Sequence, residues 1–441
     1  MAVFAFAVEF INTFSNIVDR INNVLWGDAF ILLIFGACVY LSVKCGFVQL
    51  KPGSLFGAVF GRHENEKGKM SRFAAISTAL AASMGTGNII GTAAALAMGG
   101  AGAVLWMCVS AFFGMAAAYA ENYIGAVYGE RDGFRPPVTY IRDIPCGKYL
   151  SAVYAAVCVG AAFSMGNMIQ GNAFCKSVQL MCGADIHIIA AVFAVLAGCI
   201  ILGGAERISS AAEKMIPFAS VMYILLAVWA LIIYRDRLPR VFGEIFSSAF
   251  GLRAAAGGVM GYGVKRAVSI GIRRGVFSNE AGLGSSVSVH SACGCTDPDR
   301  AGKWAACEVF IDTVICCTLT ALVVLAGGGD ISVSGEAAAL EQAFSCIPFG
   351  IGKIMLPLLT AVFAAASMLG WCCCGELCLS NLTKSKNAGR IYRGLHIILL
   401  YIGGAADMSV LWGTADIFNW LMLAVNLSAV IILSGKIKKN N

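Results

Sequence analysis

The chain has 441 residues, of which 59% are hydrophobic and 13% are charged, and its formal net charge is +7. Because soluble proteins carry roughly 25% charged residues, this composition and a mean hydropathy of +0.78 exclude an ordinary soluble protein. Apolar runs near the roughly 20 residues that cross a bilayer recur along the chain and predict a multi-pass membrane protein. The basic residues lie in short loops, so we expect the lipid bilayer as a partner and no nucleic acid.

The N-terminal segment 1–14 carries Glu9 and Asn12 among apolar residues, which predicts a short interfacial helix. Charged breaks then separate eleven candidate membrane helices in an all-α fold. In chain order they cover 26–46, 74–98, 102–127, 149–180, 186–203, 213–234, 266–292, 304–327, 352–379, 391–405 and 411–434.

Ten of these spans divide into two sets of five, at 74–234 and 266–441, which predicts two repeats of opposite topology. Residues 1–73 would hold the interfacial segment, one extra span and a cytoplasmic loop, and 235–265 would connect the repeats outside. Lys and Arg concentrate after the first, third and ninth spans and at the end of the chain, so we expect an external N-terminus and a cytoplasmic C-terminus in the plasma membrane. The connector 235–265 would be external in this orientation, although it is rich in basic residues, which are expected on the cytoplasmic side.

Two spans contain segments that disfavour a continuous helix. Ser83–Gly91 contains three glycines, each costing a helix about 1 kcal/mol relative to alanine, and Ser278–Ser285 is a second polar break. Unwound backbone at membrane depth lines a cavity or binds a ligand, and paired breaks in two halves indicate the binding site of a secondary transporter. The alternative is a glycine-rich surface for helix packing.

Each break offers specific chemistry. Backbone N–H groups over Gly85–Asn88 would face an anion such as a carboxylate, and carbonyls near Ala81 and Met84 would suit Na⁺. Glu280 is either functional or a structural partner of an arginine at 273 or 274. A stripe in the fourth span could bind a polar solute or join helices, and both readings stay open. Its residues are Phe163, Asn167, Gln170 and Phe174.

Four other acidic residues in the spans are interpreted as structural partners of loop arginines, with proton relays as the alternative. They are Glu308, Asp312, Glu376 and Asp416. Eighteen cysteines lie mostly in apolar segments without a CxxC pair, so they are interpreted as small hydrophobic residues.

Several segments carry a resemblance over most of the chain. They are TALAASMGTGNIIGTAAAL (78–96), GNMIQGN (166–172), EKMIPF (213–218), RGVFSNEAGLGS (274–285), FIDT (310–313), LGWCCCGE (369–376) and LWGTADIFNWLM (411–422). Together they resemble the alanine/glycine:cation symporter family, also called the sodium:alanine symporters. The resemblance implies a leucine-transporter-type fold with two inverted five-helix repeats and two discontinuous helices.

The resemblance also implies a binding site. It places the substrate carboxylate at Thr86, Gly87 and Asn88, and the remaining substrate contacts at Gln170, Phe277, Asn279 and Trp371. Analogy with the fold places Na⁺ at Ala81, Met84, Phe363 and Ser367. Ala366 stands where relatives carry a hydroxyl residue, and Cys372–Cys374 include the positions of an aromatic pair usual after the tryptophan.

The sequence therefore predicts symport of a small neutral amino acid, alanine or glycine, with Na⁺ by alternating access and without an organic cofactor. The first alternative is a proton-coupled or Na⁺-independent transporter of the same fold, working through Glu280 or Glu308. An ion channel or sensor would need polar faces along several spans. The hypothesis of a membrane enzyme is not supported, because the sequence shows no metal-ligand spacing, nucleophile–base pair or phosphate loop.

Overall fold

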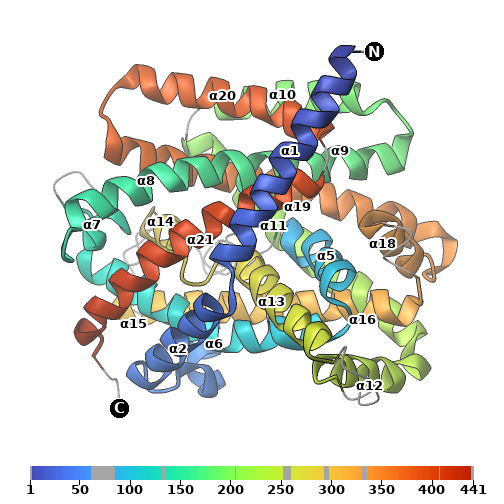
Figure 1. The fold of residues 1–441 in the computed structure, drawn as a ribbon, viewed down its shortest axis with the longest axis horizontal. Coiled ribbons are helices and arrows are strands. Elements are labelled where there is room, and N and C mark those ends of the chain that lie inside the picture. Colours follow the sequence, from blue (N-terminus) through green and yellow to red (C-terminus); the bar gives the residue numbers. More distant parts are fainter. Residues whose placement is uncertain are drawn as a thin grey trace.

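The computed structural model describes residues 2–60, 85–131, 135–203, 205–251, 260–292, 297–329, 335–406 and 408–438. Every regular element in these ranges is helical, and the long helices pack into one body (Figure 1).

The helices are named here in chain order. They are α1 (Ala2–Leu25), α2 (Asp28–Lys44), α3 (Pro52–Phe60), α5 (Ile90–Gly99), α6 (Gly102–Tyr128), α7 (Val138–Ile141), α8 (Gly147–Phe163), α9 (Ile169–Cys182), α10 (Ile186–Ile201), α11 (Ala205–Ile233), α12 (Leu238–Ala249), α13 (Met260–Asn279), α14 (Ser285–Ala292), α15 (Pro298–Val309), α16 (Thr318–Gly327), α18 (Glu336–Phe344), α19 (Ile351–Leu382), α20 (Lys386–Ala405) and α21 (Met408–Leu433). Short 3₁₀ turns are η1 (Val48–Leu50), η2 (Thr86–Asn88), η4 (Arg235–Arg237), η6 (Pro348–Gly350) and η7 (Ser434–Lys436), and π-helical turns are η3 (Ser164–Met168) and η5 (Phe310–Cys317).

Six helical stretches among the described residues are long and apolar enough to cross a membrane, and α1 with α2, bent by 50°, makes a seventh candidate. The six are Gly102–Tyr128, Gly147–Cys182, Met215–Ile233, Pro298–Gly327, Pro348–Leu382 and Leu411–Lys436. The predicted number of eleven is not confirmed. One reason is that 74–84, the start of the second predicted span, lies outside the described residues, and another is that α10 has only 16 residues.

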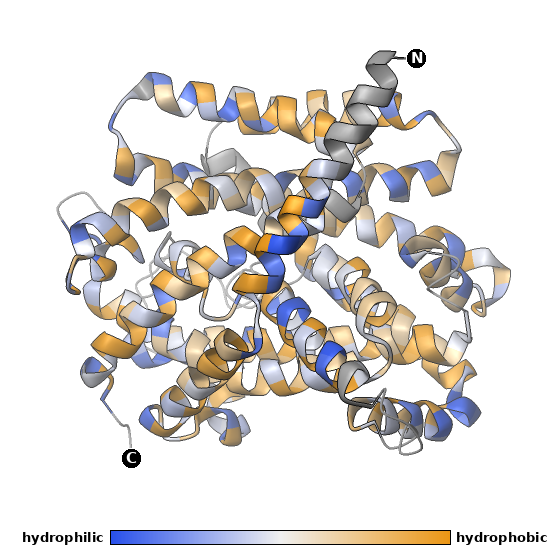
Figure 2. Cartoon of the chain, in the orientation of Figure 1, coloured by the Kyte–Doolittle hydropathy of each residue, from blue (hydrophilic) through white to orange (hydrophobic). Residues whose placement is uncertain are grey.

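Large apolar side chains lie on the outside of the molecule, as a hydrocarbon environment requires. Figure 2 shows hydrophobic residues along most of the long helices. On α10 and α11 the exposed ones include Ile188, Val192, Val195, Leu196, Phe218, Val221 and Leu225. In a soluble protein so many exposed apolar side chains would promote aggregation, so they support contact with lipid.

The N-terminal helix is longer than the sequence indicated. The interfacial helix predicted over 1–14 is part of α1, which continues to Leu25 and packs against α21. Asn22 donates to the carbonyl of Gly413 at 2.8 Å, and the Trp26 indole donates to the carbonyl of Asp416 at 3.1 Å. These bonds to a distant helix explain why the helix extends into a segment that contains several polar residues.

Close helix contacts surround α6, which packs against α13 and α15. A Cβ atom on Gly271 of α13 would lie 2.6 Å from the carbonyl oxygen of Ala103, and one on Gly302 of α15 would lie 2.7 Å from that of Tyr119. Such distances are too short for any side chain, so these glycines let the backbones approach. The core of the molecule therefore forms around α6.

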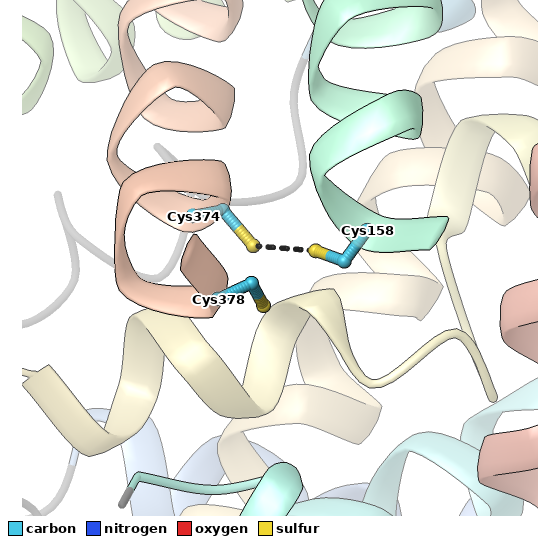
Figure 3. A group of neighbouring side chains, drawn as sticks. All are labelled: Cys158, Cys374 and Cys378. Carbon is cyan, nitrogen blue, oxygen red and sulfur yellow. Dashed lines mark hydrogen bonds between the residues drawn. The ribbon is translucent and has the colours of Figure 1, made fainter. Parts of the chain in front are cut away.

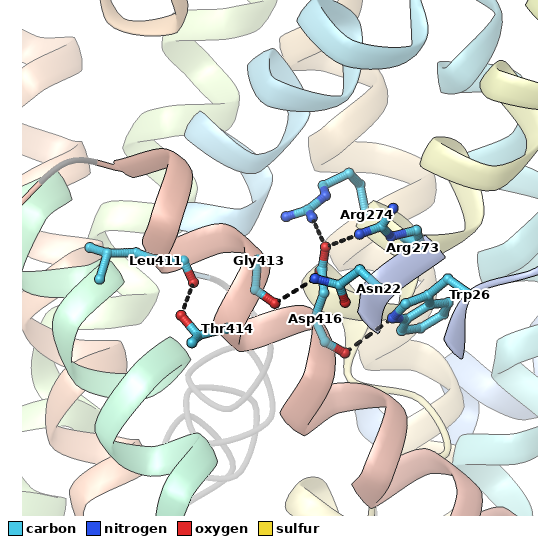
Figure 4. Close-up of polar contacts among 8 residues, drawn as sticks. All are labelled: Asn22, Trp26, Arg273, Arg274, Leu411, Gly413, Thr414 and Asp416. Carbon is cyan, nitrogen blue, oxygen red and sulfur yellow. Dashed lines mark hydrogen bonds and ion pairs between the residues drawn. The ribbon is translucent and has the colours of Figure 1, made fainter. Parts of the chain in front are cut away.

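A buried ion cluster joins α13 to α21 (Figure 4). One carboxylate oxygen of Asp416 accepts hydrogen bonds from both Arg273 and Arg274 at 2.5 Å, and the Arg274 guanidinium lies 4.5 Å from the centroid of the Trp412 ring. The side chains of Asp416 and Arg274 are each only 2% exposed. The prediction that Asp416 pairs with arginine is confirmed, although these arginines belong to a helix and not to a loop.

The change Asp416→Asn should destabilise the folded protein by about 3–5 kcal/mol, because it removes the carboxylate that the buried Arg274 and the partly buried Arg273 share. The measurement is thermal unfolding of the purified protein in detergent. The control is Asp28→Asn, which breaks a 2.7 Å pair with Lys265 whose partners are both 62% exposed, and which should cost about 1 kcal/mol or less. Equal losses in the two variants would contradict the structural role of the cluster.

Candidate substrate and cation site

The first break is present where the sequence placed it. Gly85 is extended, η2 forms a single 3₁₀ turn, and α5 begins at Ile90. The Asn88 side-chain oxygen accepts a hydrogen bond from the Gly85 N–H at 3.0 Å, which ties the turn together. The predicted cation ligands Ala81 and Met84 lie outside the described residues.

The second break separates α13 from α14. Between Asn279 and Ser285 the backbone takes positive φ at Glu280 (55°), Gly282 (84°) and Gly284 (79°). Glycine adopts this left-handed region without strain, whereas other residues do so rarely. The second predicted discontinuous helix is therefore confirmed.

The two breaks face each other. A Cβ atom on Gly87 would lie 3.1 Å from the Cα of Ser278, so only a glycine leaves normal space at this crossing. Phe277 and Trp412 both pack against Gly91, and their ring centroids lie 4.7 Å apart. Segments almost two hundred residues apart thus form one unwound region inside the protein.

Two further helices reach the first break. The Thr86 hydroxyl donates to the side-chain oxygen of Gln170 on α9 at 2.7 Å, and both residues are buried. A Cβ on Gly85 would lie 2.7 Å from the Ser367 hydroxyl, which places α19 against the same turn. Phe363, one turn earlier on α19, is buried and packs edge-on against Tyr223 of α11. The structure therefore gathers Thr86, Gln170 and Ser367 around η2.

A buried carboxylate lies between the breaks. One Asp312 oxygen accepts from the Asn88 amide at 2.6 Å, and the other accepts from the hydroxyls of Ser278 at 2.8 Å and Thr313 at 2.7 Å. The Asn279 amide donates to Thr313 at 3.3 Å. Asp312 is fully buried, and it forms no ion pair with any residue that the structure describes. Its partners among the described residues are therefore polar groups and not the loop arginine that the sequence suggested.

Comparison with known proteins identifies the family of this chain. The sequence matches the model of the sodium:alanine symporter family over residues 11–441. The chain belongs to this family. Membership makes it a Na⁺-coupled amino-acid symporter, and so a membrane transporter and not an enzyme.

Similar sequences and one solved structure agree with membership in this family. The sodium/alanine symporter AgcS of Methanococcus maripaludis is 35% identical over 96% of this symporter and 95% of its own chain. The amino-acid carrier protein AlsT of Bacillus subtilis is 30% identical over 96% and 90%. The crystal structure of MhsT in complex with L-phenylalanine superposes with a TM-score of 0.60 at 18% identity, covering 84% of this chain and 90% of MhsT. That likeness confirms the predicted leucine-transporter-type fold.

The four residues of the stripe on the fourth span of the symporter contact different partners. Only Gln170 contacts the first break, whereas Asn167 donates to the carbonyl of His396 at 2.7 Å and Phe174 stacks on Phe193 with centroids 3.7 Å apart. Phe163 packs on Tyr392. The π-helical turn η3 adds a residue to the helical repeat and so rotates the residues beyond it. The other three residues contact neighbouring helices, as the helix-joining interpretation predicted.

Trp371 and Glu280 are connected at the second break. The Trp371 indole donates to one Glu280 oxygen at 2.9 Å, and the Ser285 hydroxyl donates to the other at 2.5 Å. A Cβ on Gly166 would lie 2.3 Å from the Cβ of Trp371, so the indole packs directly on η3. The alternative pairing of Glu280 with Arg273 or Arg274 is wrong, because both arginines pair with Asp416 as described above.

The remaining acids of the symporter have different partners. Glu308 pairs with His290 at 2.9 Å and not with a loop arginine, so that interpretation is wrong. Glu376 pairs with Arg393 at 2.5 Å, as predicted.

A carboxylate that the sequence did not single out supports the second break. Glu121 on α6 accepts from the Gly284 N–H at 3.1 Å, from the Ser286 hydroxyl at 3.1 Å and from the Asn426 amide at 2.7 Å. Unwound backbone inside a membrane protein needs such partners. An acidic residue within the third predicted span was the only signal in the sequence.

The change Glu121→Leu should weaken the second break, because it removes the acceptor for three buried donors at about 1–3 kcal/mol each. Hydrogen–deuterium exchange in detergent should then be faster in peptides covering 276–290 than in peptides from α10. The control is Glu130→Leu, since that side chain is 58% exposed and pairs only with Arg135. Unchanged exchange in Glu121→Leu would show that the bonds do not hold the break.

Proposed function

We propose that this symporter carries a small neutral amino acid, alanine or glycine, with Na⁺ across the plasma membrane by alternating access. The observation that carries the proposal is the meeting of two helix breaks at Gly87 and Ser278, with a buried carboxylate between them. Breaks in both halves of a transporter supply backbone groups for a substrate and an ion at the same depth.

The substrate carboxylate binds at the first break in this proposal. The first N–H groups of a helical turn lack partners within the helix and carry partial positive charge. Thr86, Gly87 and Asn88 form such a turn, in which the Asn88 N–H donates to the Gly85 carbonyl at 3.3 Å. Gly87 has no Cβ, so Ser278 of the second break packs directly against this turn. Gln170 is held against Thr86 at 2.7 Å and lines the same place.

The rest of the amino acid lies toward the second break. Phe277 and Asn279 come from α13, and Trp371 extends from α19 to Glu280. All three side chains are at least 93% buried, with exposed fractions of 4%, 7% and 7%. An indole fixed by a hydrogen bond and by packing on η3 limits the space for the substrate side chain. Alanine or glycine fits this arrangement better than a large amino acid.

Two groups of oxygen atoms are proposed to hold the cation. Na⁺ is a hard cation that prefers oxygen ligands, and the buried Asp312 carboxylate gathers the hydroxyl oxygens of Ser278 and Thr313. Intramembrane acids of this kind mark ion pathways by default. A second group comprises the Ser367 hydroxyl and the Phe363 carbonyl, which lie on the helix that contacts Gly85, together with Ala81 and Met84.

The proposal also includes the repeats and the orientation of the chain in the membrane. The five-helix repeats cover 74–234 and 266–441, the N-terminus is external and the C-terminus is cytoplasmic. Because ion and substrate bind to neighbouring groups, each raises the affinity for the other by the same factor.

The test is uptake of labelled L-alanine and glycine into proteoliposomes, with an inward Na⁺ gradient compared with an equal K⁺ gradient. Accumulation above equilibrium only with Na⁺ supports the proposal. Accumulation driven by a pH gradient without Na⁺ would instead favour proton coupling. A current carried without amino acid would favour a channel, and failure to transport either amino acid would overturn the assigned substrate.

A further inference from the structure

Three buried thiols meet between two helices, away from the oxygen groups described above. Cys158 lies on α8, and Cys374 and Cys378 lie one turn apart on α19 (Figure 3). Their exposed fractions are 0%, 2% and 1%. Figure 3 shows the sulfur atoms of Cys158 and Cys374 facing each other, with Cys378 next to them. The spacing along the sequence did not indicate this cluster, because Cys158 is more than two hundred residues from its neighbours.

The sulfur triangle has the size of a metal site. Metal–sulfur bonds near 2.3 Å place three sulfurs around a central ion about 4 Å from one another. The sulfurs of Cys158 and Cys374 are 3.8 Å apart, and all three ligand atoms lie within 4.8 Å of one another. An ion could therefore bind with only small movements of the side chains.

The other cysteines of the same helix do not join the cluster, so chance crowding of a cysteine-rich segment does not explain it. Cys372 packs against Phe193 and Leu400, and its carbonyl accepts from the Tyr392 hydroxyl at 3.1 Å. Cys373 is half-buried. The helical repeat turns only Cys374 and Cys378 toward α8.

We propose that Cys158, Cys374 and Cys378 form a site for a soft cation, and that Cu⁺ is the ion it takes. Thiolate sulfur selects soft ions, among them Cu⁺ and Zn²⁺. Structural zinc sites are closed by four ligands, whereas the described residues offer three sulfurs, a number that suits Cu⁺. Binding exchanges a thiol proton for each copper–thiolate bond that forms, and no electron is transferred.

The site lies next to the second break. Tyr154, one turn before Cys158, donates its hydroxyl to the carbonyl of Leu283 at 2.8 Å. Trp371, one turn before Cys374, donates to Glu280. Copper bound between α8 and α19 would therefore join the two helices whose neighbouring turns hold the break. This inference does not depend on the proposed substrate or on Na⁺ coupling.

The test is anaerobic titration of the full-length protein, purified and reduced in detergent, with Cu⁺ held by a coloured chelator. The parent protein should withdraw one more equivalent of copper than Cys158→Ser and Cys378→Ser. Matched controls on α19, Cys372→Ser and Cys373→Ser, should withdraw as much as the parent. Exposed thiols such as Cys146, Cys182 and Cys199 remain in every variant and contribute equally.

X-ray absorption at the copper edge provides a second readout on the parent protein, which does not depend on whether the serine variants fold. A shell of three sulfur atoms around copper is expected. Equal copper uptake by the parent and both cluster variants would overturn the proposal, as would a copper shell of nitrogen and oxygen or failure of the reduced parent to withdraw copper.

Discussion

Amino-acid uptake should fall at least tenfold in Thr86→Val, while the protein still inserts and folds. Valine keeps the shape of threonine but removes the hydroxyl that donates to Gln170 at 2.7 Å. The buried amide oxygen then lacks its donor, at a cost of about 1–3 kcal/mol, and a factor of ten corresponds to about 1.4 kcal/mol. Because Thr86 also forms the turn proposed to hold the carboxylate, we expect this loss in substrate binding. Initial rates of alanine uptake into proteoliposomes measure it.

Two controls make this result specific. Thr86→Ser retains a hydroxyl and should recover most of the uptake. Thr360→Val removes an equally buried hydroxyl on α19, but that hydroxyl bonds only to the carbonyl of Leu356 in its own helix at 2.8 Å, so uptake should stay near that of the parent. Normal uptake in Thr86→Val would remove the first break from the substrate site.

The second large effect is expected in Asp312→Asn, which should raise the Na⁺ concentration for half-maximal uptake by roughly 10- to 100-fold. An amide keeps the size of the carboxylate but removes its charge, and hydrogen bonds to charged groups are worth about 1.5–3 kcal/mol. The three groups that donate to Asp312 come from both breaks and from its own turn. The Na⁺ dependence of uptake at a fixed alanine concentration gives the shift.

The comparison variant for this second experiment is Asp143→Asn. Its carboxylate is 46% exposed and pairs with Arg131 at 3.6 Å, so the Na⁺ dependence should be unchanged. If Asp312→Asn leaves the Na⁺ dependence intact but makes uptake insensitive to a pH gradient, the carboxylate carries a proton and not Na⁺.

Asn88 contacts both the turn proposed to bind the substrate and the carboxylate proposed to bind the ion. Its side-chain oxygen accepts from the Gly85 N–H, and its amide donates to Asp312 at 2.6 Å. Its backbone carbonyl also accepts from the Thr320 hydroxyl at 2.7 Å. A substrate that orders the turn would therefore orient a group next to the proposed ion, which gives a physical route for coupling between neighbouring sites.

Much of this protein could be predicted without coordinates. Composition decides that the chain lies in a membrane, and glycines with polar neighbours at 85–91 and 278–285 locate both breaks, because helix propensity is a local property. The resemblance to the sodium:alanine symporters rests on contiguous segments such as RGVFSNEAGLGS and is confirmed by the family match.

Only the tertiary structure shows which buried polar side chains pair with one another. Arg273 and Arg274 pair with Asp416 and leave Glu280 to Trp371, and Asp312 turns toward Asn88 and Ser278 instead of an arginine. A single π-helical turn lies between Phe163 and Gln170 and changes the register of the stripe. The sequence by itself determines local helix strength and membrane depth, which depend on neighbouring residues. Which buried charges and thiols meet depends on how helices distant in the sequence rotate and pack, and no local pattern contains that information.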